Sequence, residues 1–169
     1  MKIALIMLAA GNSRRFGSNK LLYEIDGKPM YRHILEKLMV VAELLEETCS
    51  KSLECDENRL GELKKEINKQ CKKTIGLSVG SNAKLSYQNN CYKKITVVTQ
   101  YEEIEQAARA LGANVYINPH PDEGISSSLK IGLKANLDAD ACFFTVSDQP
   151  WLTAETIHQL ITLLKISNK

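Results

Sequence analysis

The sequence predicts an α/β fold of three layers, with helices on both faces of a mostly parallel sheet. Two observations predict it. Short apolar segments rich in β-branched residues alternate with longer segments of helical period, which is the pattern of consecutive βαβ units. The apolar segments are hydrophobic at nearly every position, as expected for strands that are covered on both faces. At 169 residues, the chain is expected to form a single domain over residues 1–169.

Four strands are expected. The first, Ile3–Leu8, is a short and uniformly apolar run, and we place it at the centre of the sheet. The second, Ile95–Thr99, is rich in β-branched residues. Two further strands are expected at Val115–Ile117 and Ala141–Val146. In an open parallel sheet, ligands bind beyond the carboxyl ends of the strands, so the residues just after these segments are candidates for a site.

Helices are predicted between the strands. Behind Pro29, which suits the first turn of a helix, apolar residues repeat at helical spacing through Leu45. Gly112 is placed to end the next helix, and Thr153 can cap the last one. The expected helices after the first cover residues 102–111, 126–136 and 153–165.

Residues 43–94 interrupt this alternation and predict an insertion that is largely helical or loop-like. Within it, residues 58–73 have the pattern of an amphipathic helix, and residues 76–90 are polar. Four of the five cysteines lie in this range. Because the number of cysteines is odd, none is in a C-x-x-C pair and no export signal is convincing, we expect reduced thiols and a cytoplasmic protein.

The composition excludes two classes of binding partner. The formal charge of +2 comes from 22 basic and 20 acidic side chains, a balance that argues against a nucleic-acid partner. No apolar run is long enough to span a bilayer, so no membrane partner is expected either. We expect the histidines, His33, His120 and His158, to be structural or solvated, and Trp151 to be a packing anchor.

The loop after the first strand has the composition of a phosphate site. Small residues from Ala9 to Gly11 let the backbone approach a ligand closely, and backbone N–H groups in such a loop can cradle an anion. Arg15 can grip phosphate oxygens with two hydrogen bonds, and Lys20 can act as a point charge. Neither usual glycine fingerprint is present. On local physics, an ordinary strand-to-helix turn with solvated arginines explains the loop equally well.

Two further stretches lie just after predicted strands. Asp148 comes shortly after Ala141–Val146, where a single carboxylate can bind Mg²⁺ together with substrate phosphates; the alternative is a turn aspartate bonded to its own backbone. Asn118 precedes a proline-rich loop that leads to Ser126–Ser128, whose hydroxyls and free N–H groups can bind a base, ribose or phosphate. The alternative for these serines is a redundantly capped helix.

Together the three stretches resemble the MobA-like NTP transferase family. The first motif is Leu8-Ala9-Ala10-Gly11-x-Ser13-x-Arg15-Phe16-Gly17-x-x-Lys20. The second is Gly124-Ile125-Ser126-Ser127-Ser128-Leu129, and the third is Ser147-Asp148-Gln149-Pro150. The Leu-Ala-Ala-Gly and Asp-Gln-Pro sequences look closest to the molybdenum cofactor cytidylyltransferase branch.

The resemblance implies a Rossmann-like α/β fold of the nucleotide-diphospho-sugar transferase type. It also implies an Mg²⁺-dependent transfer of CMP from CTP to the terminal phosphate of the molybdopterin cofactor, with release of pyrophosphate. A molybdenum hydroxylase would receive the product. The implied catalytic residues are Arg15, Lys20 and Asp148, with Asp148 as the metal ligand. The implied nucleotide-binding residues are Leu8, Ala9, Ala10, Gly11, Ser13, Asn118, Ser126, Ser127 and Ser128.

The sequence departs from the family pattern in the long 43–94 segment and in ending at residue 169, before the glycine-rich and acidic segments that the family carries further on. We therefore expect a shortened C-terminus. Two alternatives stay open. One is a nucleotidyltransferase with another nucleotide or acceptor, such as GTP or a sugar phosphate. The other is a truncated, non-catalytic protein that binds a nucleotide or cofactor.

Overall fold

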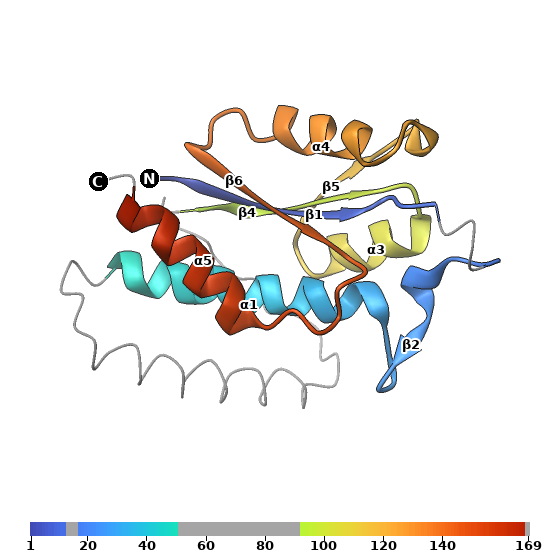
Figure 1. The fold of residues 1–169 in the computed structure, drawn as a ribbon, viewed down its shortest axis with the longest axis horizontal. Helices are drawn as coiled ribbons and strands as arrows, with labels where there is room; N and C mark the ends of the chain where they lie inside the picture. The colour runs from blue at the N-terminus through green and yellow to red at the C-terminus, as the bar shows by residue number, and fades with distance from the viewer. Residues whose placement is uncertain (13–16, 51–91, 168–169) are drawn as a thin grey trace.

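A parallel sheet of four strands forms the centre of the molecule (Figure 1). The computed structural model describes residues 1–12, 17–50 and 92–167. The strand order is β5-β4-β1-β6, and every pairing in this sheet is parallel. The predicted position of the first strand inside the sheet is therefore confirmed. The strands are β1 (Ile3–Ala9), β4 (Tyr92–Thr99), β5 (Asn114–Ile117) and β6 (Ala141–Val146).

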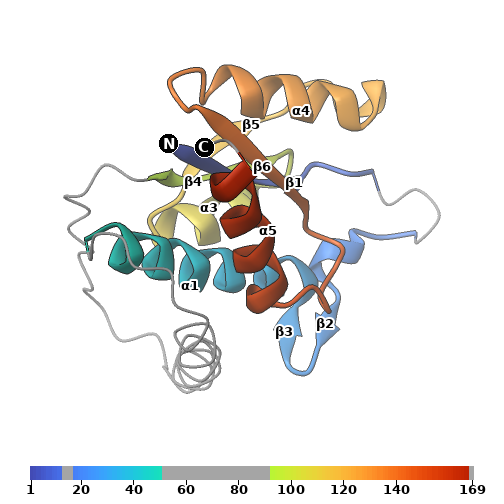
Figure 2. The same cartoon turned by 60° about the vertical axis from the view of Figure 1, so that its left-hand side comes forward.

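Helices cover both faces of the sheet, which confirms the three layers (Figures 1 and 2). Helix α4 (Ile125–Lys134) lies on one face. The other face carries α1 (Met30–Ser50), α3 (Glu102–Ala110) and α5 (Ala154–Ser167). The two residues predicted to end and to cap helices do so. Gly112 has a φ of 85° just after α3. The Oγ1 of Thr153 accepts a hydrogen bond from the Thr156 N–H (3.1 Å) at the start of α5.

The core consists of two apolar layers, one on each side of the sheet. All seven residues of β1 are buried, as its uniform hydrophobicity predicts. The layer under α4 is the smaller, and Gly132 lets that helix approach the sheet closely. A Cβ at Gly132 would lie 2.8 Å from the Cγ2 of Ile6, closer than real Cβ contacts. Because β1 is buried between β4 and β6, the position of its last residue is fixed. The loop that follows β1 therefore leaves the sheet from a fixed point.

A small hairpin between β1 and α1 was not predicted. It pairs β2 (Glu24–Ile25) with β3 (Lys28–Pro29), and Asp26 and Gly27 take φ values of 51° and 75° at its tip. Positive φ at both positions is what a tight two-residue hairpin turn requires. Pro29 accordingly lies in β3, immediately before α1, and not in the first turn of the helix.

The structure also differs from the sequence-based expectations elsewhere. Helix α1 continues to Ser50 and β4 already begins at Tyr92, so both extend into the range 43–94. The rest of that range, with the expected helix at 58–73, lies outside the described residues. Trp151 is 75% exposed, so its prediction as a packing anchor is wrong. In the described part of the chain, no helix has the length and hydrophobicity that crossing a membrane requires.

Candidate functional site

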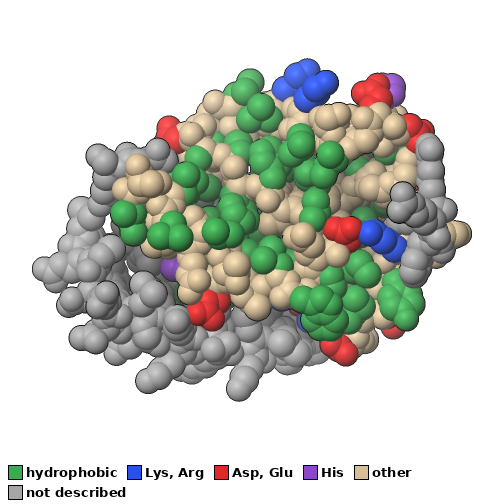
Figure 3. Space-filling model, viewed as in Figure 1, with side chains coloured by type: hydrophobic (Ala, Val, Ile, Leu, Met, Phe, Trp, Pro, Cys, Tyr) green, Lys and Arg blue, Asp and Glu red, His purple; other side chains and the backbone are tan. Residues whose placement is uncertain are grey.

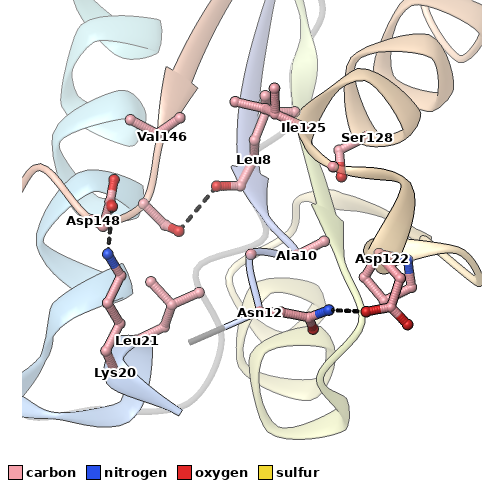
Figure 4. Close-up of a pocket in the computed structure, with 14 residues that line it drawn as sticks. Leu8, Ala10, Asn12, Lys20, Leu21, Asp122, Ile125, Ser128, Val146 and Asp148 are labelled. Atoms are coloured by element: carbon pink, nitrogen blue, oxygen red, sulfur yellow. Dashed lines mark hydrogen bonds and ion pairs between the residues drawn. The ribbon is translucent and has the colours of Figure 1, made fainter. Parts of the chain in front are cut away.

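A cavity of about 700 Å³ opens at the carboxyl edge of the sheet (Figure 4). Its walls come from four places: the loop after β1, the short helix η1 (Lys20–Leu22), the turn after β6, and the segment from η2 (Pro121–Glu123) into α4. Because the strands are parallel, their carboxyl ends bring these segments together although they are far apart in sequence. The volume suits a small-molecule ligand.

One wall of the cavity carries an ion pair. The Nζ of Lys20 lies 2.6 Å from the Oδ2 of Asp148, and each side chain is 38% exposed (Figure 4). Lys20 is the first residue of η1, which is capped by the Asn19 side chain and held by the buried Leu21. Figure 3 shows an acidic and a basic side chain in contact at the surface, beside a group of hydrophobic side chains. The pair places one cation and one carboxylate at the mouth of the cavity.

The turn that carries Asp148 is tied to both neighbouring elements. The N–H and the Oγ of Ser147 both donate to the carbonyl oxygen of Leu8, at 3.0 and 2.9 Å. From the other side, the Nζ of Lys37 on α1 donates to the carbonyl oxygen of Pro150. Asp148 therefore projects from a turn whose backbone is fixed at both ends.

The opposite wall is polar as well. The Nδ2 of Asn12 donates to the Oδ1 of Asp122 (2.6 Å), which joins the loop after β1 to η2 along this wall (Figure 4). The Nε2 of Gln100 donates to the Oδ1 of Asn12 (2.7 Å). Neither Asn12 nor Asp122 was singled out from the sequence, although both lie inside stretches that were. Their pairing joins residues that are 110 positions apart, and no motif in the sequence predicts it.

The serine segment divides into distinct environments. Ser128 lines the cavity. The carbonyl oxygens of His120 (3.0 Å) and Gly124 (2.9 Å) both lie within hydrogen-bond distance of the Oγ of Ser127, which has one proton to donate, and this Oγ accepts from the Nδ2 of Asn118 (2.8 Å). Asn118 is 1% exposed and its Nδ2 also bonds Ser128. In this structure Asn118 and Ser127 therefore hold the turn into α4.

The structure brings many of the sequence-predicted site residues together and leaves others apart. Leu8, Ala10, Gly11, Lys20, Ser128 and Asp148 all line the cavity. The Ala9 side chain is buried in the apolar core, and Ser126 is exposed with its Oγ directed to the Glu123 carbonyl (3.4 Å). Ser13 and Arg15 lie outside the described residues. Lining residues that sequence reasoning did not choose include Leu21, Gly124, Ile125, Val146 and Ser147.

The donor set allows binding of an anion and of a hard cation. Lys20 and the backbone of the loop after β1 suit phosphate oxygens, and the half-exposed carboxylate of Asp148 suits Mg²⁺. Among the described residues, no three His, Cys, Asp or Glu side chains gather closely enough to hold a metal by themselves. A cation here would depend on oxygens from a ligand, which is how Mg²⁺ binds beside substrate phosphates.

The model of the MobA-like NTP transferase domain matches residues 5–49 and 59–169, most of the chain. A short segment is 53% identical, over 38 residues, to a probable molybdenum cofactor guanylyltransferase of Pyrococcus horikoshii; it spans 22% of this chain and 20% of that protein. A relative of the same name from Thermococcus sibiricus is 50% identical over 34 residues, 20% of this chain and 17% of its own length. Both names specify guanylyl transfer, whereas the motifs point to the cytidylyltransferase branch.

Solved structures support the fold. A CMP:2-keto-3-deoxy-manno-octonic acid synthetase complexed with CTP superimposes with a TM-score of 0.59 at 17% identity, over 98% of this chain and 48% of that one. A Mycobacterium tuberculosis protein superimposes with a TM-score of 0.54 at 17% identity, over 96% of this chain and 60% of its own. The chain thus spans about half the length of these neighbours, and their likeness concerns the α/β fold.

Proposed function

This chain belongs to the MobA-like NTP transferase family, and we propose that it is a nucleotidyltransferase. Its substrates would be a nucleoside triphosphate and the molybdopterin cofactor, whose terminal phosphate accepts the nucleoside monophosphate. The proposal rests mainly on the cavity at the carboxyl edge of the sheet, which is lined by the Lys20–Asp148 pair on one wall and by the loop after β1 on another.

In the proposed reaction, an oxygen of the acceptor phosphate attacks the α-phosphorus of the triphosphate. The bond between that phosphorus and the oxygen bridging to the β-phosphate breaks, and pyrophosphate leaves with the electron pair. The acceptor oxygen is already ionised near neutral pH, so the protein needs no strong general base. Catalysis then consists of positioning and charge stabilisation, which the cavity walls can supply.

The roles follow from the charges. Lys20 would neutralise the triphosphate and the growing charge on pyrophosphate, and the loop from Ala10 to Asn12 would bind phosphate oxygens through its N–H groups. Arg15 and Ser13 would join them, as the family resemblance implies. In this structure Lys20 is paired with Asp148 at 2.6 Å, so triphosphate binding would exchange a protein carboxylate for phosphate as the partner of Lys20.

We propose Mg²⁺ as the cofactor, held by Asp148 together with substrate phosphates. The fit rests on a half-exposed carboxylate at the cavity mouth, because Mg²⁺ commonly uses one or two protein carboxylates and keeps its other positions for phosphates and water. When bound, the ion would offset the negative charge of the phosphates. A molybdenum hydroxylase would receive the nucleotide form of the cofactor.

The base of the nucleotide has two candidates, each favoured by a specific observation. The Leu-Ala-Ala-Gly and Asp-Gln-Pro sequences around Gly11 and Asp148 favour CTP. The names of the two relatives favour GTP. Because their matching segments span about a fifth of this chain, we carry both nucleotides into the experiment and propose transfer from either CTP or GTP.

A ligand panel tests the proposal. CTP, GTP and ATP are added with and without Mg²⁺, and the unfolding transition is followed. A ligand at 100 times its dissociation constant stabilises the native state by about 2.7 kcal/mol. We expect CTP or GTP to stabilise the protein more strongly with Mg²⁺, and pyrophosphate release to require molybdopterin.

Two variants serve as a matched pair in this panel. Lys20→Met should lose most of the stabilisation, whereas Lys130→Met, which removes an exposed charge on α4, should keep it. Stabilisation without pyrophosphate release from any nucleotide would support the non-catalytic binding protein instead. No stabilisation by any nucleotide would contradict both the transferase and the binding protein.

A further inference from the structure

Three consecutive carbonyl groups, of the last residue of β1 and the two residues after it, accept hydrogen bonds from the side chains of the last residue of β4 and the two residues after it. The Oγ1 of Thr99 donates to the carbonyl of Ala9 (3.0 Å), and the Nε2 of Gln100 donates to that of Ala10 (2.9 Å). The hydroxyl of Tyr101 donates to that of Gly11 (2.9 Å). We call Thr99, Gln100 and Tyr101 the carbonyl clamp.

This arrangement breaks the alternation of a β-strand. In a regular strand, successive carbonyls point to opposite neighbours. The carbonyl of Leu8 accepts from Ser147, after β6, and that of Ala9 accepts from Thr99 of β4, as the alternation requires. The next carbonyl, that of Ala10, should face β6 again. Instead it accepts from Gln100, and the carbonyl of Gly11 also accepts from the β4 side.

The clamp thereby orients the N–H groups of the loop. In a trans peptide, the carbonyl and the N–H of one peptide group point in opposite directions, and the described chain contains no cis peptide. The Gln100 bond fixes the peptide that carries the N–H of Gly11, and the Tyr101 bond fixes the peptide that carries the N–H of Asn12. Both N–H groups must point away from Gln100 and Tyr101, the two donors that follow β4.

We propose that Gln100 and Tyr101 are positioning residues, which hold the N–H groups of Gly11 and Asn12 toward the cavity as a preformed site for the phosphates of the nucleotide. Consecutive N–H groups on one side of a chain make a concave site for an anion. The inference deepens the proposed function and rests on its phosphate site. Neither residue lines the cavity, so each acts through the loop backbone.

The surroundings of the two side chains suit this role. Tyr101 packs against the main apolar core, and burial raises the pKa of its hydroxyl from an ordinary value that already lies above physiological pH. Gln100 donates to the side chain of Asn12 as well (2.7 Å), and Asn12 in turn bonds Asp122 (2.6 Å). The loop is thus held both by the residues that follow β4 and by η2.

The test follows individual amide groups by NMR while inorganic pyrophosphate is added to the protein. In the unmodified protein, the Gly11 and Asn12 amide protons should shift downfield in a saturable way. Tyr101→Phe removes one hydroxyl, so it should weaken pyrophosphate binding about three- to ten-fold and diminish mainly the Asn12 shift. Gln100→Met should weaken binding similarly and diminish mainly the Gly11 shift.

Matched controls remove the same groups elsewhere. Tyr116→Phe on the edge strand β5 and Gln106→Met on α3 should leave pyrophosphate binding and both amide shifts unchanged. Variants of Gln100 and Tyr101 that bind pyrophosphate with the original affinity and the original amide shifts would overturn the positioning role. So would an unmodified protein in which pyrophosphate moves neither amide.

Turnover separates this inference from the proposed function. If pyrophosphate moves the two amides and the Gln100 and Tyr101 variants diminish those shifts, but no nucleotide is transferred to molybdopterin, the proposed reaction fails and the positioning role stands. If nucleotide transfer occurs but pyrophosphate does not change the chemical shifts of the Gly11 and Asn12 amide protons, the proposed reaction stands and the positioning role fails.

Discussion

Replacing Asp148 by asparagine separates a catalytic role from a structural one. The substitution keeps the size of the side chain and removes its charge. Asp148 is bonded to Lys20 at 2.6 Å, and its turn is held independently by Ser147 and by Lys37 on α1. The amide can still accept a hydrogen bond from Lys20, so the turn should keep its conformation.

The structure limits what the Lys20–Asp148 pair contributes to stability. Both side chains are 38% exposed, and solvent-exposed ion pairs contribute about 0–1 kcal/mol. Asp148→Asn should therefore lower the free energy of unfolding by less than about 1 kcal/mol. Asp138→Asn is the matched control, because it breaks an exposed pair with Lys2 (2.9 Å), and its effect on stability should be as small.

The expected effect on turnover is much larger. An amide oxygen is a poorer Mg²⁺ ligand than a carboxylate, and the described residues offer no cluster of three candidate ligands to replace it. Removing a group that stabilises charge in the transition state typically costs about 100- to 1,000-fold in rate. We expect Asp148→Asn to lose pyrophosphate release by about that factor, and Asp138→Asn to lose none.

The assay measures pyrophosphate release with CTP or GTP and molybdopterin, beside nucleotide binding without metal and unfolding in urea. Metal-free nucleotide binding should not weaken in Asp148→Asn, because the substitution only removes a carboxylate that competes with phosphate for Lys20. Normal turnover in this variant would mean that Asp148 is a turn residue and that the metal is held elsewhere. A loss of several kcal/mol in stability would instead mean that the pair has a structural role that its exposure does not reveal.

Three further outcomes are expected from the packing and the charges. Gly132→Ala places a Cβ 2.8 Å from the Cγ2 of Ile6, so the helix or the side chain must shift, and the free energy of unfolding in urea should fall by about 1–3 kcal/mol. Burial, with a smaller contribution from Lys165, lowers the pKa of His158 below 6.5, so the unfolded state takes up the proton first as the pH falls. Stability should therefore decline below a pH of about 6.5, and His158→Gln should remove that slope. Thr153→Ala removes the cap of α5 and should cost about 1 kcal/mol, measured by the same unfolding transition.

The fold could be predicted from the sequence because its central strands are buried on both faces. All seven residues of β1 (Ile3–Ala9) are buried, and so are residues 95–99 of β4, as their apolar and β-branched sequences predict. The strand β6 (Ala141–Val146) is similarly apolar, but it lies at the edge of the sheet and most of its residues are only partly buried. The β2–β3 hairpin was not predicted because strands of two residues carry no measurable period, although Asp26-Gly27 is a recognised signal for a tight turn. The exposure of Trp151 could not be predicted either, since hydrophobicity favours burial and only the tertiary structure decides it.

The candidate site could be predicted in outline and not in its pairings. The rule for ligands at parallel sheets was enough to place Lys20 and Asp148 at one edge, 128 residues apart in sequence. It could not separate Ser127, which is bonded within the turn, from Ser128, which lines the cavity. That difference depends on which side of the first turn of α4 each serine side chain faces. Three consecutive serines in the sequence do not indicate this.

The carbonyl clamp depends on the register of β4 against β1, which is set far from the site. Ala4 pairs with Lys93, an offset of 89 residues, whereas Ile6 pairs with Thr96, an offset of 90, so β4 accommodates one extra residue between them. The clamp keeps the offset of 90: Thr99 bonds Ala9, and its two successors bond the next two carbonyls.

Without that extra residue, the offset of 89 would continue to the end of the strands and would place Thr99 beside Ala10. Gln100 would then lie beside Gly11, and each donor would face the wrong carbonyl. Irregularities of this kind are common next to functional sites, where they redirect side chains. The irregularity near the start of β1 therefore affects the site at its end. It aligns the three donors of the carbonyl clamp with the three carbonyl groups of the loop that we propose binds phosphate.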